Sequence, residues 1–152
     1  PVMENCFKVL TKFGIEYEGK ICSAHRSPNQ AAELATHAKD NGFAVIIAAA
    51  GLAAHLPGVL ASFTILPVIG VPCKGGALNG VDALYAIVQM PTGIPVATVA
   101  IDGAANAAIL AAQILALQDE RLANKLAAYK KELEDSVMLR NERLAQKLSQ
   151  ME

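Results

Sequence analysis

The middle of this 152-residue chain has very little charge. Between residues 43 and 117 only Lys74, Asp82 and Asp102 are formally charged, whereas the last 35 residues carry 14 of the chain's 27 charges. A monomer of this size could not cover so apolar a middle with its own polar surface. We therefore expect a homo-oligomer with large apolar interfaces between its copies.

Long apolar runs are also absent, because prolines and glycines interrupt the middle of the chain. No segment offers the roughly 20 continuous apolar residues that a membrane span needs, so no membrane partner is expected. The net charge of −1 likewise gives no indication of a nucleic-acid partner. Without a recognisable signal peptide, we expect a cytoplasmic protein.

Cysteine and metal-ligand patterns are sparse. The three cysteines, Cys6, Cys22 and Cys73, are odd in number and lack CxxC spacing, so they indicate reduced thiols that pack as small hydrophobes. The sequence shows no paired carboxylates, no metal-ligand cluster and no Ser/His/Asp arrangement. We therefore expect neither a metal site nor a cysteine nucleophile.

What the chain does contain is an alternation of helical and extended patterns. Helices are predicted over residues 3–13, 28–41, 56–62, 81–89 and 104–117, and strands over residues 44–48, 67–71 and 95–101, with a further strand-like run at residues 17–22. Continuous apolar, β-branched runs are typical of central strands in a parallel sheet. The alternation predicts a three-layer α/β fold. Because such sheets usually begin with a strand, we expect a first strand and its phosphate loop before Pro1.

The end of the chain has a different pattern. From Asp119 onward, apolar residues recur at helical spacing within a charged background: Leu122, Leu126, Tyr129, Leu133, Val137, Leu144 and Leu148. This pattern predicts a long helix with one apolar stripe. We therefore divide the chain into a catalytic domain, residues 1–118, and a helical arm, residues 119–152, that packs on the core or on a neighbouring subunit.

The strongest candidate site lies at Ser23-Ala24-His25-Arg26-Ser27-Pro28. Ser27 and Pro28 have the residue types of a helix start, which places His25 and Arg26 beside a helix N-terminus at the end of an extended run. Anionic ligands bind at such positions in open α/β sheets. A proton carrier beside a fixed cation indicates chemistry on a phosphorylated or carboxylated small molecule.

Two further loops follow predicted strands. Small residues at positions 48–54 would let backbone N–H groups approach a bound anion, but the loop matches neither a Walker A nor a GxGxxG pattern. His55 either faces this site or is a hydrogen-bonded structural histidine. Lys74, in the next loop, is interpreted as a solvated lysine, and His37 as a surface residue.

Taken in order, five motifs resemble the N5-carboxyaminoimidazole ribonucleotide mutase family, class I of the phosphoribosylaminoimidazole carboxylases. They are Ser23-Ala24-His25-Arg26-Ser27-Pro28, Ala53-Ala54-His55-Leu56-Pro57-Gly58, Pro67-Val68-Ile69-Gly70-Val71-Pro72, Ile87-Val88-Gln89-Met90-Pro91 and Ala105-Asn106-Ala107-Ala108. The match extends to about Leu117. The related carboxylase class usually has a lysine after the histidine, where this chain has Arg26.

The resemblance implies a flavodoxin-like α/β/α sandwich, a homo-octamer with sites between subunits, and no metal or organic cofactor. It implies that carboxylate moves from N5 to C4 of aminoimidazole ribonucleotide through CO2, with His25 as catalytic proton shuttle and Arg26 on the substrate phosphate. The remaining substrate-binding residues that it implies are Ser23, Ala24, Ala48, Ala49, His55 and Leu56. A transient contact with the N5-carboxyaminoimidazole ribonucleotide synthetase is left open.

The chain departs from the family pattern at Ala49 and Leu52, where glycine is usual. Two alternatives to the mutase stay open at this point. One is a carboxylase that uses CO2 directly, and the other is a flavodoxin-like oligomeric binding module with a degraded site.

Overall fold

The computed structural model describes residues 1–151, which form two compact units, residues 1–112 and the part from Gln113 onward. The first unit contains a parallel sheet in the order β1-β2-β3, formed by β1 (Ile46–Gly51), β2 (Val68–Cys73) and β3 (Ala97–Thr98). Its helices are α1 (Val2–Phe13), α2 (Pro28–His37), α3 (Leu56–Ser62), α4 (Val81–Val88) and most of α5 (Ala104–Ala116). The second unit contains the end of α5 and α6 (Glu120–Ser149).

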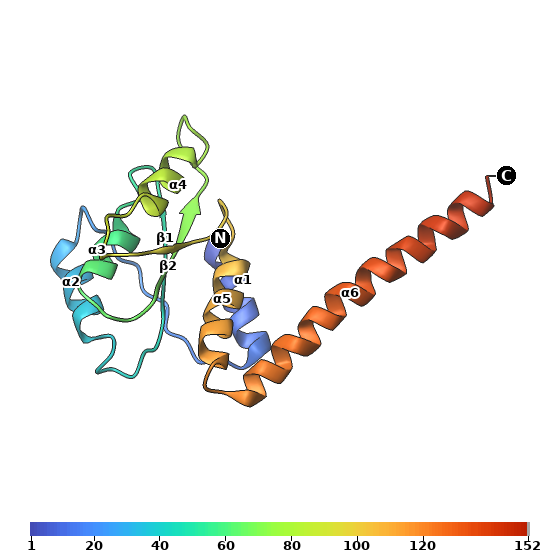
Figure 1. Ribbon diagram of the computed structural model, residues 1–152. Helices are drawn as coiled ribbons and strands as arrows, with labels where there is room; N and C mark the ends of the chain where they lie inside the picture. Colours follow the sequence, from blue (N-terminus) through green and yellow to red (C-terminus); the bar gives the residue numbers. More distant parts are fainter. Residues whose placement is uncertain (152) are drawn as a thin grey trace. The chain divides into compact units, whose positions relative to one another are not determined.

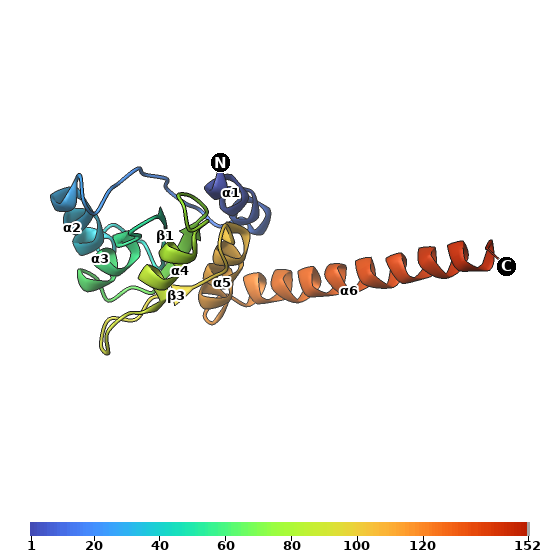
Figure 2. The ribbon, with the colours of Figure 1, turned by 90° about the horizontal axis from the view of Figure 1, so that it is seen from above.

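Helices lie on both sides of the sheet in the first unit. Figures 1 and 2 show α2 and α3 on one side of β1 and β2, and α1 with the first part of α5 on the other side. Because side chains alternate along a strand, Ala48 of β1 packs with Ala31 and Ala35 of α2 and with Leu60 of α3. The arrangement confirms the predicted three-layer α/β fold with a parallel sheet.

The prediction of a strand over residues 17–22 is wrong. Residues 15–23 have no regular secondary structure, and Ile21 is 98% exposed. The run is held by side chains instead of a backbone ladder. Tyr17 stacks on Phe7 of α1 at 5.2 Å between ring centroids, and Lys20 pairs with Glu18 at 3.0 Å. The candidate site therefore follows an extended segment and not the end of a strand.

Strand β3 is much shorter than the predicted strand over residues 95–101. Gly70 of β2 lies opposite Thr98 and its carbonyl accepts the Val99 N–H at 3.2 Å. The next group on this edge of β2 belongs to Pro72, which has no N–H to donate. The Pro72 carbonyl accepts the Asp102 N–H at 2.8 Å, so residues after Thr98 follow β2 through separate bonds and not through a regular ladder.

The helices agree more closely with the predicted ranges. The predicted range for α3 is the observed one, and α1 ends at Gly14, whose φ of 73° is the left-handed conformation that suits glycine at a helix end. Helix α2 ends at His37, earlier than predicted, because residues 38–42 form turns. Among residues 1–151, no helix combines the length and the hydropathy needed to cross a bilayer.

Candidate active site

The loop before α2 is a tight turn held by two serines. Ser27 Oγ donates to the Ser23 carbonyl at 3.1 Å and accepts the Ser23 N–H at 3.0 Å, while Ser23 Oγ accepts the Arg26 N–H at 3.2 Å. Ser27 occupies the predicted N-cap position of α2, but its hydroxyl makes no capping bond because it is turned back toward Ser23. The turn fixes the backbone of residues 24–26 while the side chains of His25 and Arg26 stay exposed.

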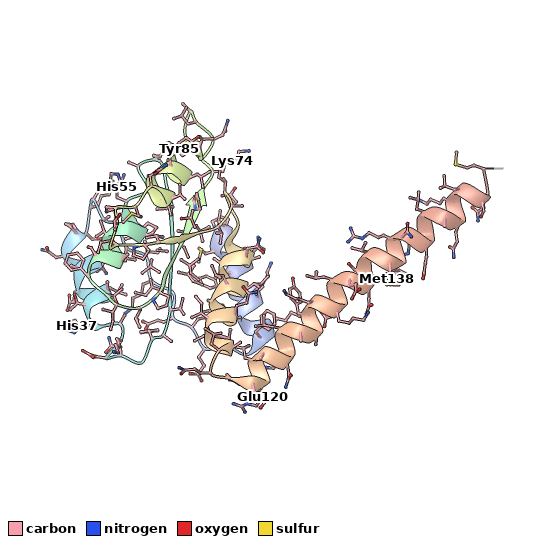
Figure 3. The ribbon with its side chains drawn as sticks, in the orientation of Figure 1. His37, His55, Lys74, Tyr85, Glu120 and Met138 are labelled. Atoms are coloured by element: carbon pink, nitrogen blue, oxygen red, sulfur yellow. The ribbon has the colours of Figure 1, made fainter. Side chains whose placement is uncertain are left out.

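His25 and His55 form a hydrogen-bonded pair. His25 Nε2 and His55 Nδ1 are 2.7 Å apart, and the rings are perpendicular with centroids 4.9 Å apart. His55 is the residue directly before α3, where Figure 3 labels it. Because the rings do not overlap, the short N···N bond holds them together. The sequence left open whether His55 faces the site or is a hydrogen-bonded structural histidine. In the structure it is hydrogen-bonded, and its partner is the candidate proton carrier His25.

The Arg26 guanidinium is exposed, and within residues 1–151 it has no ion pair or side-chain hydrogen bond. It lies two residues before the first residue of α2. The free N–H groups and the dipole of a helix N-terminus favour negative charge there. An unpaired guanidinium at this position suits a bidentate contact with a phosphate or a carboxylate.

The other predicted site residues occupy a different environment. Ala48, Ala49 and Leu56 line a groove of about 740 Å³ between residues 18–22 and the open edge of β1. Neither histidine of the pair, nor Ser23, Ala24 or Arg26, lines this groove. The predicted site residues therefore fall into two groups. The turn of residues 23–26 lies beside His55, which bonds to His25. Ala48 and Ala49 of β1 and Leu56, the first residue of α3, line the groove instead.

Leu52, at one of the two departures from the family pattern, has a φ of 54°. This is the left-handed region, where glycine has no steric cost. Its Cδ2 atom lies 2.5 Å from the place where a Cβ on Gly76 would stand, so Leu52 covers the turn after β2. Ala49 is different, because it pairs in register with Val71 within the regular ladder of β1 and β2.

Sequence reasoning assigned no role to Asp82 or Asp102. Asp102 Oδ1 accepts the Lys74 N–H at 2.9 Å, which ties the loop after β2 to the loop after β3. Asp82 stands in the first turn of α4, and within residues 1–151 its Oδ1 is buried without a hydrogen-bond partner. Charged residues are rare in the apolar middle of the chain, and Asp82 and Asp102 are two of its three. That rarity is the feature of the sequence that could have singled them out.

Two of the three cysteines have thiols that are poor nucleophiles. Burial raises the pKa of the Cys6 thiol to about 11, so this group is protonated at neutral pH. Burial also raises the pKa of Cys73, and the nearby Asp102 carboxylate adds to the shift. Both thiols therefore lack the thiolate character that a nucleophile needs. Only Cys6 is buried as the packing interpretation expects; Cys22 is half-buried, lies with its Sγ 3.9 Å from Ser27 Oγ and lines the groove.

Comparison with known proteins gives consistent matches along the chain. The family described as "AIRC: AIR carboxylase" matches residues 1–136. A Pyrococcus horikoshii protein named N5-carboxyaminoimidazole ribonucleotide mutase is 54% identical over 144 residues, which are 95% of this chain and 81% of that protein. A Thermotoga maritima protein of the same name is 53% identical over 146 residues, 96% of this chain and 85% of that protein. The crystal structure of Treponema denticola PurE superposes with a TM-score of 0.83 at 27% identity and covers 94% of this chain and 89% of that one.

Proposed function

This chain belongs to the AIR carboxylase family, and we propose that it is an isomerase of purine biosynthesis, an N5-carboxyaminoimidazole ribonucleotide mutase. The observation that carries the proposal is the His25–His55 bond of 2.7 Å beside the unpaired Arg26. Relatives more than 50% identical over more than nine-tenths of the chain are named as this mutase. The substrate is accordingly a small ribonucleotide.

The proposed chemistry needs one proton carrier that acts in two directions. As the bond between N5 and its carboxylate carbon breaks, CO2 leaves and protonated His25 gives a proton to N5. C4 then attacks CO2, a carbon–carbon bond forms, and C4 loses its proton to His25. An imidazole can serve in both steps because its ordinary pKa lies close to neutrality.

The residues around His25 supply binding groups for the same substrate. We assign the phosphate to Arg26 because its guanidinium is exposed and unpaired beside α2. Ser23 and Ala24 belong to the turn that fixes His25, and Ala48, Ala49 and Leu56 complete the proposed binding set, while His55 joins the site through its bond to His25. A closed apolar site formed between subunits would retain CO2 and keep water away from it.

We also propose a cytoplasmic homo-octamer in which residues 119–152 form an arm on a neighbouring subunit. On α4, Val81, Tyr85 and Val88 are 42%, 62% and 48% exposed and are spaced along one face of the helix. On α6, Leu133, Val137, Leu144 and Leu148 are also exposed. Apolar faces of this kind on a chain with so uncharged a middle are typical of protein interfaces. A contact with the synthetase that makes the labile substrate is part of the same proposal.

The proposal is tested by replacing His25 in the full chain. His25→Asn should lower kcat for conversion of N5-carboxyaminoimidazole ribonucleotide by about 100-fold or more, which is the usual contribution of general acid–base catalysis. Binding of the ribonucleotide, measured by isothermal titration, should persist because Arg26 is unchanged. Thr36→Asn is the control, since Thr36 is exposed on α2, contacts neither histidine of the pair, does not line the groove of Ala48, Ala49 and Leu56, and should keep normal turnover.

Near-normal turnover of His25→Asn would refute the assignment. A second assay supplies aminoimidazole ribonucleotide and bicarbonate in place of the N5-carboxylated substrate. If the C4-carboxylated product forms from aminoimidazole ribonucleotide and bicarbonate but not from the N5-carboxylated substrate, the protein is a carboxylase and the mutase assignment is contradicted. No heat of ribonucleotide binding with the unmodified chain would indicate a binding module with a degraded site.

A further inference from the structure

The bond between the two histidines occupies one nitrogen of each ring. His25 uses Nε2 and His55 uses Nδ1, at a separation of 2.7 Å. Within residues 1–151, neither His25 Nδ1 nor His55 Nε2 has a further hydrogen-bond partner. Only His25 Nδ1 on the first ring is therefore free to meet a substrate.

The number of protons on the pair limits how this bond can be made. One proton lies between His25 Nε2 and His55 Nδ1, and either ring can supply it when both rings are neutral. If His25 Nε2–H donates, the bond survives when His25 becomes an imidazolium, because Nε2 keeps its proton and Nδ1 gains the second. If His55 Nδ1–H donates instead, protonation of His25 puts two N–H groups against each other and breaks the bond. Only the first arrangement serves both states of a proton carrier.

The backbones of both histidines are held in place. His25 lies in the turn closed by Ser23 and Ser27. The His55 N–H donates to the Ala53 carbonyl at 2.8 Å, and the His55 carbonyl accepts the Val59 N–H at 2.9 Å. Pro57, in the first turn of α3, is buried and anchors this end of the helix. His55 is thus fixed well enough to orient another ring.

Resting on the proposed function, we propose that His55 is a positioning residue for His25. Its Nδ1 accepts the His25 Nε2–H bond in both protonation states of His25 and makes Nδ1 of His25 the atom that exchanges a proton with the substrate. The assisting group in a catalytic triad acts on its histidine in the same way, by selecting the tautomer and orientation. His55 itself neither takes nor gives a proton during turnover.

Two replacements of His55 separate this role from a role as a second proton carrier. His55→Asn places an amide oxygen close to the position of Nδ1 and keeps an acceptor, whereas His55→Leu removes the acceptor at similar size. We expect His55→Leu to lower kcat by about 10- to 100-fold, less than the roughly 100-fold or more that loss of the general acid–base group itself would cause, with KM changed less than about threefold. His55→Asn should recover most of the lost kcat. If His55→Asn lowers kcat as much as His55→Leu does, the proposal is overturned, because an acceptor alone would then not replace His55 and the residue would have to carry a proton.

A readout without substrate tests the same inference separately from the mutase assignment. In ¹⁵N NMR spectra of the histidine-labelled full chain, the neutral His25 ring should be the Nε2–H tautomer, with signals assigned by comparison with His25→Asn and His37→Asn. In His55→Leu the Nε2–H tautomer should remain, because a free histidine ring also favours it, but the downfield shift that the hydrogen bond gives the His25 Nε2 proton should be lost. A His25 ring in the Nδ1–H tautomer in the unmodified chain would overturn the proposal even if His55→Leu does not fold. Absence of mutase turnover in the unmodified chain would instead contradict the proposed function.

Discussion

At the scale of single residues, Gly70 of β2 leaves no room for a side chain between the sheet and the structure that covers it. A Cβ on Gly70 would collide with Ile87 Cγ2 of α4 and would stand 3.0 Å from Val96 Cγ1 and 3.3 Å from Pro57 Cβ. Ile87 is fully buried and belongs to the cluster that also contains Ala54 and Ala83. The absence of a side chain at Gly70 lets α3, α4 and β2 approach, and α3 is the helix whose start carries His55.

We predict that Gly70→Ala destabilises the fold by about 1–3 kcal/mol, because extra volume in a packed core forces its neighbours to move. The free energy of unfolding from urea titration gives the measurement. Gly75→Ala is the matched control, since nothing lies within 4 Å of its Cβ position and its φ is not in the left-handed region. Equal stability of the two variants would contradict this account of the packing.

At the scale of elements, the start of α6 is capped by a side chain. Asp119 Oδ1 accepts the Arg121 N–H at 2.9 Å and the Leu122 N–H at 3.2 Å, which satisfies two of the free donors at the helix start. Of the described residues of α6, only Leu122 is buried. These two bonds hold the backbone of the first turn of α6.

Asp119→Ala should therefore destabilise the start of α6 by about 1 kcal/mol, the usual value for loss of a cap side chain. Amide hydrogen exchange in residues 120–124 should become about fivefold faster as local opening becomes more frequent. Asp119→Asn keeps an acceptor oxygen and should exchange at nearly the original rate. Unchanged exchange in the alanine variant would show that the two observed bonds contribute nothing to the helix.

At the scale of the whole molecule, the distribution of charge is the dominant feature. Three charges in residues 43–117 leave apolar side chains on the surface of α4, where Figure 3 labels Tyr85. Val81, Tyr85 and Val88 form a face that water solvates poorly and that a second copy could cover. The proposed oligomer follows from this surface.

A charge in the middle of that face should weaken the association. Tyr85→Lys is expected to shift the protein toward smaller species at micromolar concentration in light scattering, because burying an unpaired ammonium in an apolar interface is costly. Thr36→Lys on α2 adds the same charge at another exposed position and should leave the mass unchanged. A Tyr85→Lys protein with the original mass would exclude this face from the interface.

Local sequence patterns were sufficient for most elements and insufficient where an element depends on a distant neighbour. The apolar spacing and closing glycine of α1 predicted its range to within one residue. The β-branched runs predicted β1 and β2 to within three residues at each end. The strand prediction for residues 17–22 was wrong because an extended run becomes a strand only if it pairs with the edge of a sheet, and local sequence does not show that pairing. β3 was overestimated because Pro72, on another strand, interrupts the ladder.

For the site, local sequence was enough to choose His25 and Arg26 as candidates. Their side chains can carry a proton and bind an anion, and both residues stand directly before a predicted helix. The family followed from five ordered motifs for the same reason. The partner of His25 was different, since His55 is 30 residues away along the chain. The loop of His25 and the start of α3 are brought within 2.7 Å by the fold, in which β1 pairs with β2 and α3 packs on β1. Directional contacts between distant side chains depend on three-dimensional packing, which no local pattern encodes.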